Sequence, residues 1–303
     1  MKELSLPVIE TRSLTRRYGK RRGIESITLS VPEGSVFGFL GPNGAGKTTA
    51  IRVLLGFLRP TAGSASVFGL DCWRASRHAK AEIGYVPGDL RLYAWTNGAE
   101  ALGIFGSIRR RDMLGPGRQL AEQFDLDLNV KVRSMSRGMR QKLGLILALA
   151  HKPRLLVLDE PTSSLDPLMQ TQLHQHLRSL ASAGHTVFFS SHTLSEVEQL
   201  CDRVAIIREG VLVASATLDE LRVQAGHVVS IRWKDESAAS RTAPPPILDV
   251  QERESLTWTG ILKGPVHDLV AWLSAQPIDD LTITRPDLEM LFRRYYVQDR
   301  GQV

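Results

Sequence analysis

A glycine-rich loop that ends in lysine and threonine carries the strongest chemical signal in this sequence of 303 residues. Residues 41–48, "GPNGAGKT", fit the pattern GxxxxGK[ST] between a strand-like stretch and a helix-like stretch. Backbone N–H groups of such a loop can surround a β-phosphate, and the start of the following helix adds positive potential there. We therefore expect Lys47 to reach the β- and γ-phosphates and the Thr48 hydroxyl to ligate Mg²⁺.

Two adjacent acids, Asp159 and Glu160, end the apolar run "LLVLDE". An uninterrupted apolar run of this length predicts a strand buried in a parallel sheet, and open α/β sheets bind ligands beyond the carboxyl ends of such strands. Asp159 could hold Mg²⁺ directly or through water, and Glu160 could polarise an attacking water molecule. An acid pair fits a surface turn equally well, and the glycine-rich loop is what favours the functional interpretation.

Three other polar segments allow two interpretations each. In "MSRGM", Ser136 is either a helix N-cap or part of a helix end that faces a phosphate, and the residues alone favour the cap. Asp166 in "SSLD" is as readily a cap or turn residue as a functional one. His192 in "SSH" is either a solvated turn residue or, near a γ-phosphate at Asp159, a hydrogen-bond donor to it.

Strand-like and helix-like stretches alternate along the chain, which predicts an α/β core. Short strands are expected within residues 8–40, and a helix after the glycine-rich loop should end near Arg59. Residues 92–150 should be mostly helical, with a break at residues 115–117, "GPG". Further expected strands are "EIGYVP", "RLLVLDEP", "HTVFFSSH" and "RVAIIREGVLVAS". A helix, "QTQLHQHLRSLASAG", should lie between "RLLVLDEP" and "HTVFFSSH" and end at Gly184.

The last part of the chain has a different pattern. Strand-like and helix-like segments flank "RTAPPP", and a last helix is expected from about Asp287. This pattern predicts a domain over residues 1–221, with a helical subdomain at about 90–150, and a small α+β extension over residues 222–303.

Composition restricts the class of protein. Hydrophobic residues make up 43% and the net charge is +6. The apolar run at 143–150 is too short to cross a bilayer, the first residues lack a signal-peptide pattern, and the two cysteines suit a reducing cytosol. Basic clusters such as "RRYGKRR" at 16–22 occur without a nucleic-acid-reading motif, so no nucleic acid partner is expected.

The order of "GPNGAGKTT", "MSRGMRQ", "LLVLDEP", "SSLD" and "SSH" resembles the nucleotide-binding subunit of an ABC transporter, over about residues 6–220. The resemblance implies a P-loop NTPase core with an N-terminal antiparallel β-subdomain and a helical subdomain that contacts a membrane partner. The tail, with "DLEMLFRRYY", resembles the extension of drug- and antibiotic-resistance exporter ATPases.

In that family two subunits pack head to tail, which implies a homodimer or a pair with another ATPase subunit. "MSRGM" stands where the family carries its signature, usually Leu-Ser-Gly-Gly-Gln. The resemblance implies ATP and Mg²⁺ as cofactors, with Glu160, His192 and Lys47 as catalytic residues and Thr48 and Asp159 as metal ligands. The implied nucleotide-binding residues are Tyr18, which would stack on adenine, Gly41, Pro42, Asn43, Gly44, Ala45, Gly46, Lys47, Thr48, Thr49, Ser136, Gly138 and Asp166.

One departure from the family concerns Gly88, which stands where a metal-contacting Gln is usual. We interpret Gly88 as a hinge, with Asp89 near the metal as the alternative. The resemblance implies an ATP-hydrolysing subunit at the cytoplasmic face of the cell membrane, which powers export through a separate integral-membrane permease. A non-transport ABC ATPase would be expected to carry a second cassette, a coiled coil or zinc cysteines, and Glu160 argues against a nucleotide sensor without turnover.

Overall fold

The computed structural model describes residues 7–284 and Phe292. The chain divides into two compact units, Met1–Ala216 and Thr217–Val303. The domain boundary after residue 221 remains a prediction from sequence. None of the helices in the described ranges is both long and apolar enough to span a bilayer.

A central sheet with the strand order β10-β9-β3-β8-β7-β6 forms the core of the first unit. Strands β9, β3, β8, β7 and β6 run parallel, and β10 follows β9 after a two-residue turn, a connection typical of an antiparallel pair. Every residue of β3, β7 and β8 is buried. The apolar runs of β3 and β7 predict this, whereas β8 also buries Thr186, Ser190 and Ser191. The strands are β3 (Val36–Leu40), β6 (Ile83–Val86), β7 (Leu155–Asp159), β8 (Thr186–Ser191), β9 (Arg203–Arg208) and β10 (Val211–Thr217).

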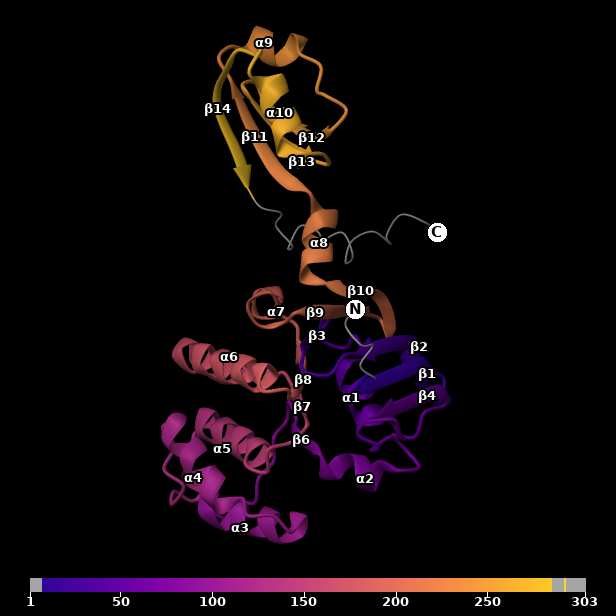
Figure 1. The fold of residues 1–303 in the computed structure, drawn as a ribbon, viewed down its shortest axis with the longest axis vertical. Helices are drawn as coiled ribbons and strands as arrows, with labels where there is room; N and C mark the ends of the chain where they lie inside the picture. The colour runs from indigo at the N-terminus through magenta and orange to yellow at the C-terminus, as the bar shows by residue number, and fades with distance from the viewer. Residues whose placement is uncertain (1–6, 285–291, 293–303) are drawn as a thin grey trace. The chain divides into compact units, whose positions relative to one another are not determined.

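Helices and a second sheet cover the two faces of the central sheet. Figure 1 shows α6 (Pro167–Ser182) and α7 (Leu194–Leu200) on one side, and α1 (Lys47–Leu54) with the N-terminal sheet on the other. That sheet has the order β2-β1-β4-β5, with antiparallel pairing. Its strands are β1 (Ile9–Tyr18), β2 (Arg21–Val31), β4 (Ala62–Val67) and β5 (Leu70–Asp71), and α2 (Ser76–Ala81) follows them.

One buried apolar cluster joins these layers. Phe37 and Phe188 of the central sheet belong to it together with Ile51 of α1 and Ile9 of β1. The rings of Phe37 and Phe188 stack with their centroids 5.9 Å apart. Because α1 is held between two sheets, its first turn, which follows the glycine-rich loop, has a fixed position.

The helical region contains α3 (Gly98–Arg109), α4 (Leu114–Gln123) and α5 (Arg137–Leu149), with a short 3-10 helix at Val132–Ser134. The break expected at residues 115–117 is wrong, since these residues form the first turn of α4. Pro116 is tolerated there because the N–H groups of a first helical turn have no intrahelical acceptor.

The first helix also ends earlier than expected, at Leu54 rather than near Arg59. Gly56 follows with φ of 62°. A glycine in this left-handed conformation just beyond the last turn is a common way for a helix to end.

The second unit begins with α8 (Leu218–Ala225) and continues in the order β11, α9, β12, β13, α10, β14. Its sheet has the antiparallel order β12-β13-β11-β14, which together with this element order is the ferredoxin-like arrangement. The rings of Trp233 and Trp258, 4.7 Å apart, lie in its own buried core. The elements are β11 (His227–Trp233), α9 (Glu236–Arg241), β12 (Leu248–Arg253), β13 (Thr257–Leu262), α10 (Val266–Leu273) and β14 (Ile278–Thr284).

The predicted fold class, an α/β core with an antiparallel N-terminal subdomain, a helical subdomain and a C-terminal α+β extension, is confirmed. The last helix expected from about Asp287 lies outside the described residues.

Candidate nucleotide site

The glycine-rich loop connects the buried strand β3 to α1. Its backbone conformation and close packing require glycine at several positions. Gly44 and Gly46 have φ of 81° and 105°, conformations that other residues rarely adopt. A Cβ on Gly41 would lie 2.3 Å from the carbonyl oxygen of Ile207, so only glycine fits beside β9. The N–H of Ala45 donates to the carbonyl of Pro42 across the loop, at 3.1 Å.

The Lys47 side chain is buried within the curve of this loop and is 5% exposed. Its Nζ donates to the carbonyl oxygens of Gly41, at 2.6 Å, and Pro42, at 3.2 Å. The same ammonium lies 3.1 Å from Glu160 Oε1. The Lys47 ammonium therefore links the glycine-rich loop to Glu160, which follows β7.

The Asp159 carboxylate is also buried, and two hydroxyl groups donate to it. Thr48 Oγ1 donates to Oδ2 at 2.9 Å, and Ser190 Oγ donates to Oδ1 at 2.6 Å. A carboxylate and a hydroxyl oxygen this close together are hard donors of the kind that Mg²⁺ takes alongside substrate phosphates. The residues present therefore fit the expected metal.

Ser190 was not among the residues singled out from the sequence. It lies opposite Asp159 in the parallel pairing of β7 with β8. The one available signal was its hydroxyl near the end of a predicted strand, two residues before His192. Its contact with Asp159 depends on which strands are neighbours, and the sequence pattern does not reveal that order.

Glu160 has a backbone conformation that is unusual for a residue with a side chain, with φ of 51°. Its N–H is held by the carbonyl and the hydroxyl of Ser190, both at 3.2 Å. Its Oε2 lies 3.3 Å from His192 Nδ1. The carboxylate is therefore fixed between Lys47 and His192, just after the Asp159 position.

A pocket of about 440 Å³ opens beside the loop and brings most of the predicted binding residues together. Arg21, Arg22 and Gly23 also line it, and these three were not singled out from the sequence as binding residues. The lining includes the first turn of α1, with Thr48 and Thr49, and the acid Glu160. Its aromatic residue is Tyr18. The predicted residues in the lining are Tyr18, Pro42, Asn43, Gly44, Gly46, Lys47, Thr48, Thr49 and Glu160.

Ser136, Gly138 and Asp166 are not in that lining. Ser136 is the N-cap of α5 and accepts a hydrogen bond from the N–H of Met139 at 3.1 Å. Asp166 caps α6 in the same way, through the N–H of Met169 at 2.9 Å. The cap interpretation of both residues is thus correct, and their role toward a nucleotide stays a prediction.

The two capped helix ends nevertheless approach each other. A Cβ on Gly138 would lie 3.3 Å from the carbonyl oxygen of Ser164, in the segment that leads to Asp166. Gln141 of α5 donates to the carbonyl of Pro161, at 3.0 Å, just after Glu160. The start of α5 is therefore connected to the turn that carries Asp159 and Glu160 (the acid turn).

Comparisons with known proteins match this arrangement. The profile described as "ABC transporter" matches residues 24–163. The chain is 33% identical to the Nod factor export ATP-binding protein I of Ralstonia nicotianae, over 97% of this chain and 92% of that protein. It is 34% identical to the daunorubicin resistance ATP-binding protein DrrA3 of Streptomyces coeruleorubidus, over 94% of each. A solved ATP-binding subunit of an ABC transporter has a TM-score of 0.67 at 28% identity, covering 72% of this chain and 92% of that one.

The chain belongs to the ATP-binding subunits of ABC transporters. The predicted family is confirmed, and with it the prediction of an ATP-binding ATPase. In this ABC subunit the pocket beside residues 41–48 is the candidate ATP site.

Gly88 occupies a position in this ABC subunit that directly faces the acid turn. A Cβ there would lie 3.2 Å from the Asp159 carbonyl oxygen and 3.9 Å from its Cγ. The Asp89 carboxylate, in contrast, accepts two hydrogen bonds from Arg91, at 2.9 and 3.0 Å, and is 79% exposed. A side chain on residue 88 would thus reach the Asp159 carboxylate, whereas the Asp89 side chain is paired with Arg91.

This geometry predicts the effect of restoring an amide at residue 88. Gly88→Gln should lower the Mg²⁺ concentration for half-maximal ATP hydrolysis by about two- to fivefold, because a neutral oxygen is added beside Asp159. Steady-state phosphate release, titrated with Mg²⁺, measures it.

Gly88→Ala is the matched control, since it adds the Cβ without an oxygen and should leave the Mg²⁺ dependence unchanged. An equal shift in both variants would show that the Cβ, and not the amide, changes the site.

Proposed function

We propose that this ABC subunit powers export through a separate integral-membrane permease, with ATP bound between two subunits packed head to tail. The observation that carries the proposal is Glu160, fixed by Lys47 and His192 directly after Asp159, because an acid held there can orient an attacking water molecule. Export is supported by the relatives named for Nod factor export and daunorubicin resistance, whose similarity extends over both units.

Hydrolysis in such a site is mainly a matter of position and electrostatics. The loop N–H groups and Lys47 bind the phosphates, and Glu160 accepts a proton from the water that attacks the γ-phosphate. His192 donates a hydrogen bond toward the γ-phosphate oxygens. Thr48 and Asp159 would hold Mg²⁺, which supplies neutralising charge to the phosphates.

The head-to-tail pairing is supported by the location of the start of α5. Ser136 is exposed and lies outside the pocket lining of its own chain. A helix N-terminus with a nearby glycine is suited to bind a phosphate, so Ser136 and the Gly138 N–H would bind ATP held by another subunit. A second copy of this chain or a related ATPase subunit could supply that nucleotide.

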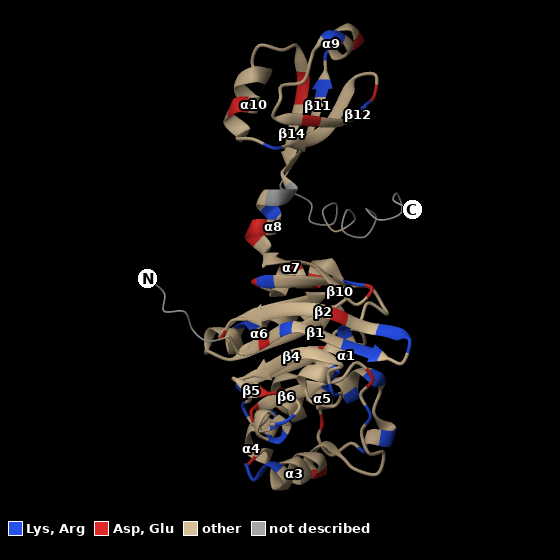
Figure 2. Cartoon of the chain, turned by 90° about the vertical axis from the view of Figure 1, so that its right-hand side faces the viewer, with Lys and Arg blue, Asp and Glu red and all other residues tan. Residues whose placement is uncertain are grey.

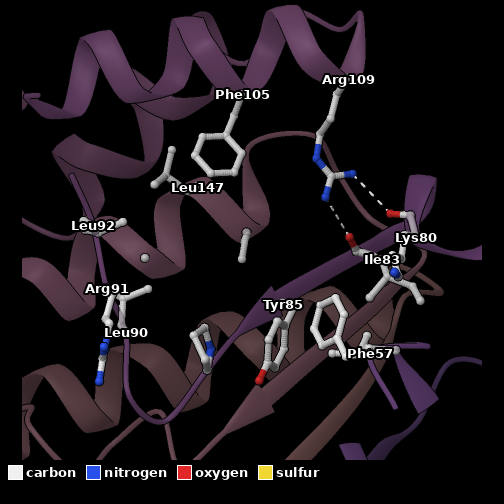
Figure 3. Close-up of a pocket in the computed structure, with 14 residues that line it drawn as sticks. Phe57, Lys80, Ile83, Tyr85, Leu90, Arg91, Leu92, Phe105, Arg109 and Leu147 are labelled. Atoms are coloured by element: carbon white, nitrogen blue, oxygen red, sulfur yellow. Dashed lines mark hydrogen bonds between the residues drawn. The ribbon is translucent and has the colours of Figure 1, made fainter. Parts of the chain in front are cut away.

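The permease is expected to dock in an apolar groove between β6 and the helical region. Figure 3 shows Phe57, Tyr85, Leu90, Leu92, Phe105 and Leu147 around it. Lys80 Nζ lies 4.7 Å from the centre of the Phe57 ring, and Arg109 donates to the carbonyl of Ile83 at 3.1 Å. The groove has a volume of about 290 Å³ and would accept side chains of a short partner helix.

The Tyr85 ring connects this groove to the catalytic end of the sheet. Burial, together with the negative charge of Asp159, raises the pKa of the Tyr85 hydroxyl to about 12. A docked permease at the groove would hold this ABC subunit on the inner face of the cell membrane.

The role of Glu160 can be tested with Glu160→Gln. This variant should bind ATP with little loss and hydrolyse it about 10²–10⁴-fold more slowly, the range for a lost general base. ATP binding and phosphate release are measured on the same preparation. Turnover near that of the unchanged protein would show that another group orients the water.

The head-to-tail pairing can be tested with mixed dimers of Lys47→Ala and Ser136→Arg chains. Both changes then fall in one composite site and leave the second site intact, so about half of the wild-type ATP hydrolysis should remain if the two sites act independently. Each variant alone places a change in both of its sites and should be inactive. Mixed dimers as inactive as the single variants would contradict the pairing.

The docking groove can be tested with Phe57→Lys, a change at a side chain that is 52% exposed. The added charge should abolish co-purification with a co-expressed permease and leave the basal ATP hydrolysis within about twofold, because an unpaired charge in an apolar contact costs several kcal/mol. Leu168→Lys on α6, at a side chain that is 69% exposed, is the control. Equal loss in both variants would show that the groove has no special role.

A further inference from the structure

The turn between β1 and β2 carries a dense group of cations beside the candidate ATP site. The segment "RRYGKRR" at 16–22 spans this turn, and Figure 2 shows Lys and Arg gathered where β1 and β2 meet. Tyr18 and Arg21 lie directly opposite each other in the antiparallel pairing, separated by Gly19 and Lys20. Side chains of such a pair project from the same face of a sheet.

Most arginines of this turn already have partners. Arg16 donates to the carbonyl of Arg59 at 3.0 Å and lies over the Tyr18 ring, 5.1 Å from its centre. The Arg17 guanidinium binds Glu25 at 2.5 Å and, with Arg22, holds the pKa of that carboxyl below its usual range. Arg22 also lies 3.6 Å from Glu209.

Arg21 differs from these neighbours. Its side chain is exposed and has no ion pair or side-chain hydrogen bond within the described part of the chain. It lines the pocket together with Tyr18, Gly23 and Thr49. Lys20, at the tip of the turn, is exposed too but does not line the pocket.

Part of the positive charge that lines the pocket is already paired with Glu160, so a cation that is unpaired within the described residues, such as Arg21, remains available for a phosphate. Lys47 shares its charge with Glu160, 3.1 Å away, and lines the pocket from the glycine-rich loop, whereas Tyr18 lines it from the turn between β1 and β2. A nucleotide whose base stacks on Tyr18 and whose terminal phosphates bind at Lys47 places its first phosphate between these two residues. A guanidinium matches phosphate oxygens with two parallel N–H groups.

We propose that Arg21 binds the α-phosphate of the nucleotide and so raises the affinity for every adenine nucleotide that carries one. This role rests on the proposed function of the pocket as an ATP site. Arg21 is a binding residue and takes no part in the hydrolytic step, which occurs at Lys47, Glu160 and His192.

The test is equilibrium binding of ATP, ADP, AMP and adenosine to the full chain, by calorimetry or nucleotide displacement. Arg21→Gln should raise the dissociation constants of ATP, ADP and AMP about three- to tenfold, the size of one partly exposed charge-assisted hydrogen bond. Binding of adenosine should not change. Arg21→Lys should recover part of the loss, because it keeps the positive charge but not the two parallel N–H groups.

Lys20→Gln is the matched control, because it removes one charge from the same turn outside the pocket. An equal loss of affinity in Lys20→Gln and Arg21→Gln would show a general effect of charge and not a specific contact of Arg21. A loss for ATP but not for AMP, or an equal loss for adenosine, would also overturn the α-phosphate contact. Failure of the unchanged protein to bind ATP would instead overturn the proposed function of the pocket.

Discussion

The hydrogen bonds of one buried carboxylate hold together the end of the core that carries the candidate nucleotide site. Asp159 ends β7, accepts from Ser190 of β8, and accepts from Thr48 of α1. Three elements distant in sequence thereby meet at one group. Loss of either hydroxyl would leave part of a buried charge without a partner, at a cost of about 1–3 kcal/mol or more. The same strand register places the Glu160 N–H against Ser190. The position of the Glu160 carboxylate, which faces Lys47 and His192, therefore follows from the contacts of Asp159.

Local patterns in the sequence predict much of this arrangement. The glycine-rich loop, the buried strands β3 and β7, and the acid pair are visible because each depends on residues that are neighbours in the chain. The positions of Ser190 and Arg21 could not be assigned because they depend on strand pairing: Ser190 faces Asp159 across parallel strands, and Arg21 shares a face with Tyr18. The start of α4 was misplaced because Gly and Pro near a helix start resemble a helix break.

The observed cap role of Ser136 is compatible with the role proposed for it toward a nucleotide. Its hydroxyl satisfies a first-turn N–H of α5, which fixes the helix end, while the remaining N–H groups of that turn stay available to a ligand. Gln141 and the Ser164 carbonyl tie the same helix end to the acid turn of its own chain. The start of α5 and the residues around Glu160 therefore form one packed unit.

The left-handed backbone of Glu160 limits which substitutions the fold can accept at this position. A residue with a side chain in that conformation costs about 1–2 kcal/mol relative to glycine. A glycine would remove that strain but would also leave the buried Lys47 ammonium without its ionic partner, which costs as much or more. The strained glutamate is therefore retained by its own contacts, since the ion pair with Lys47 and the hydrogen bonds of its N–H to Ser190 hold it in place.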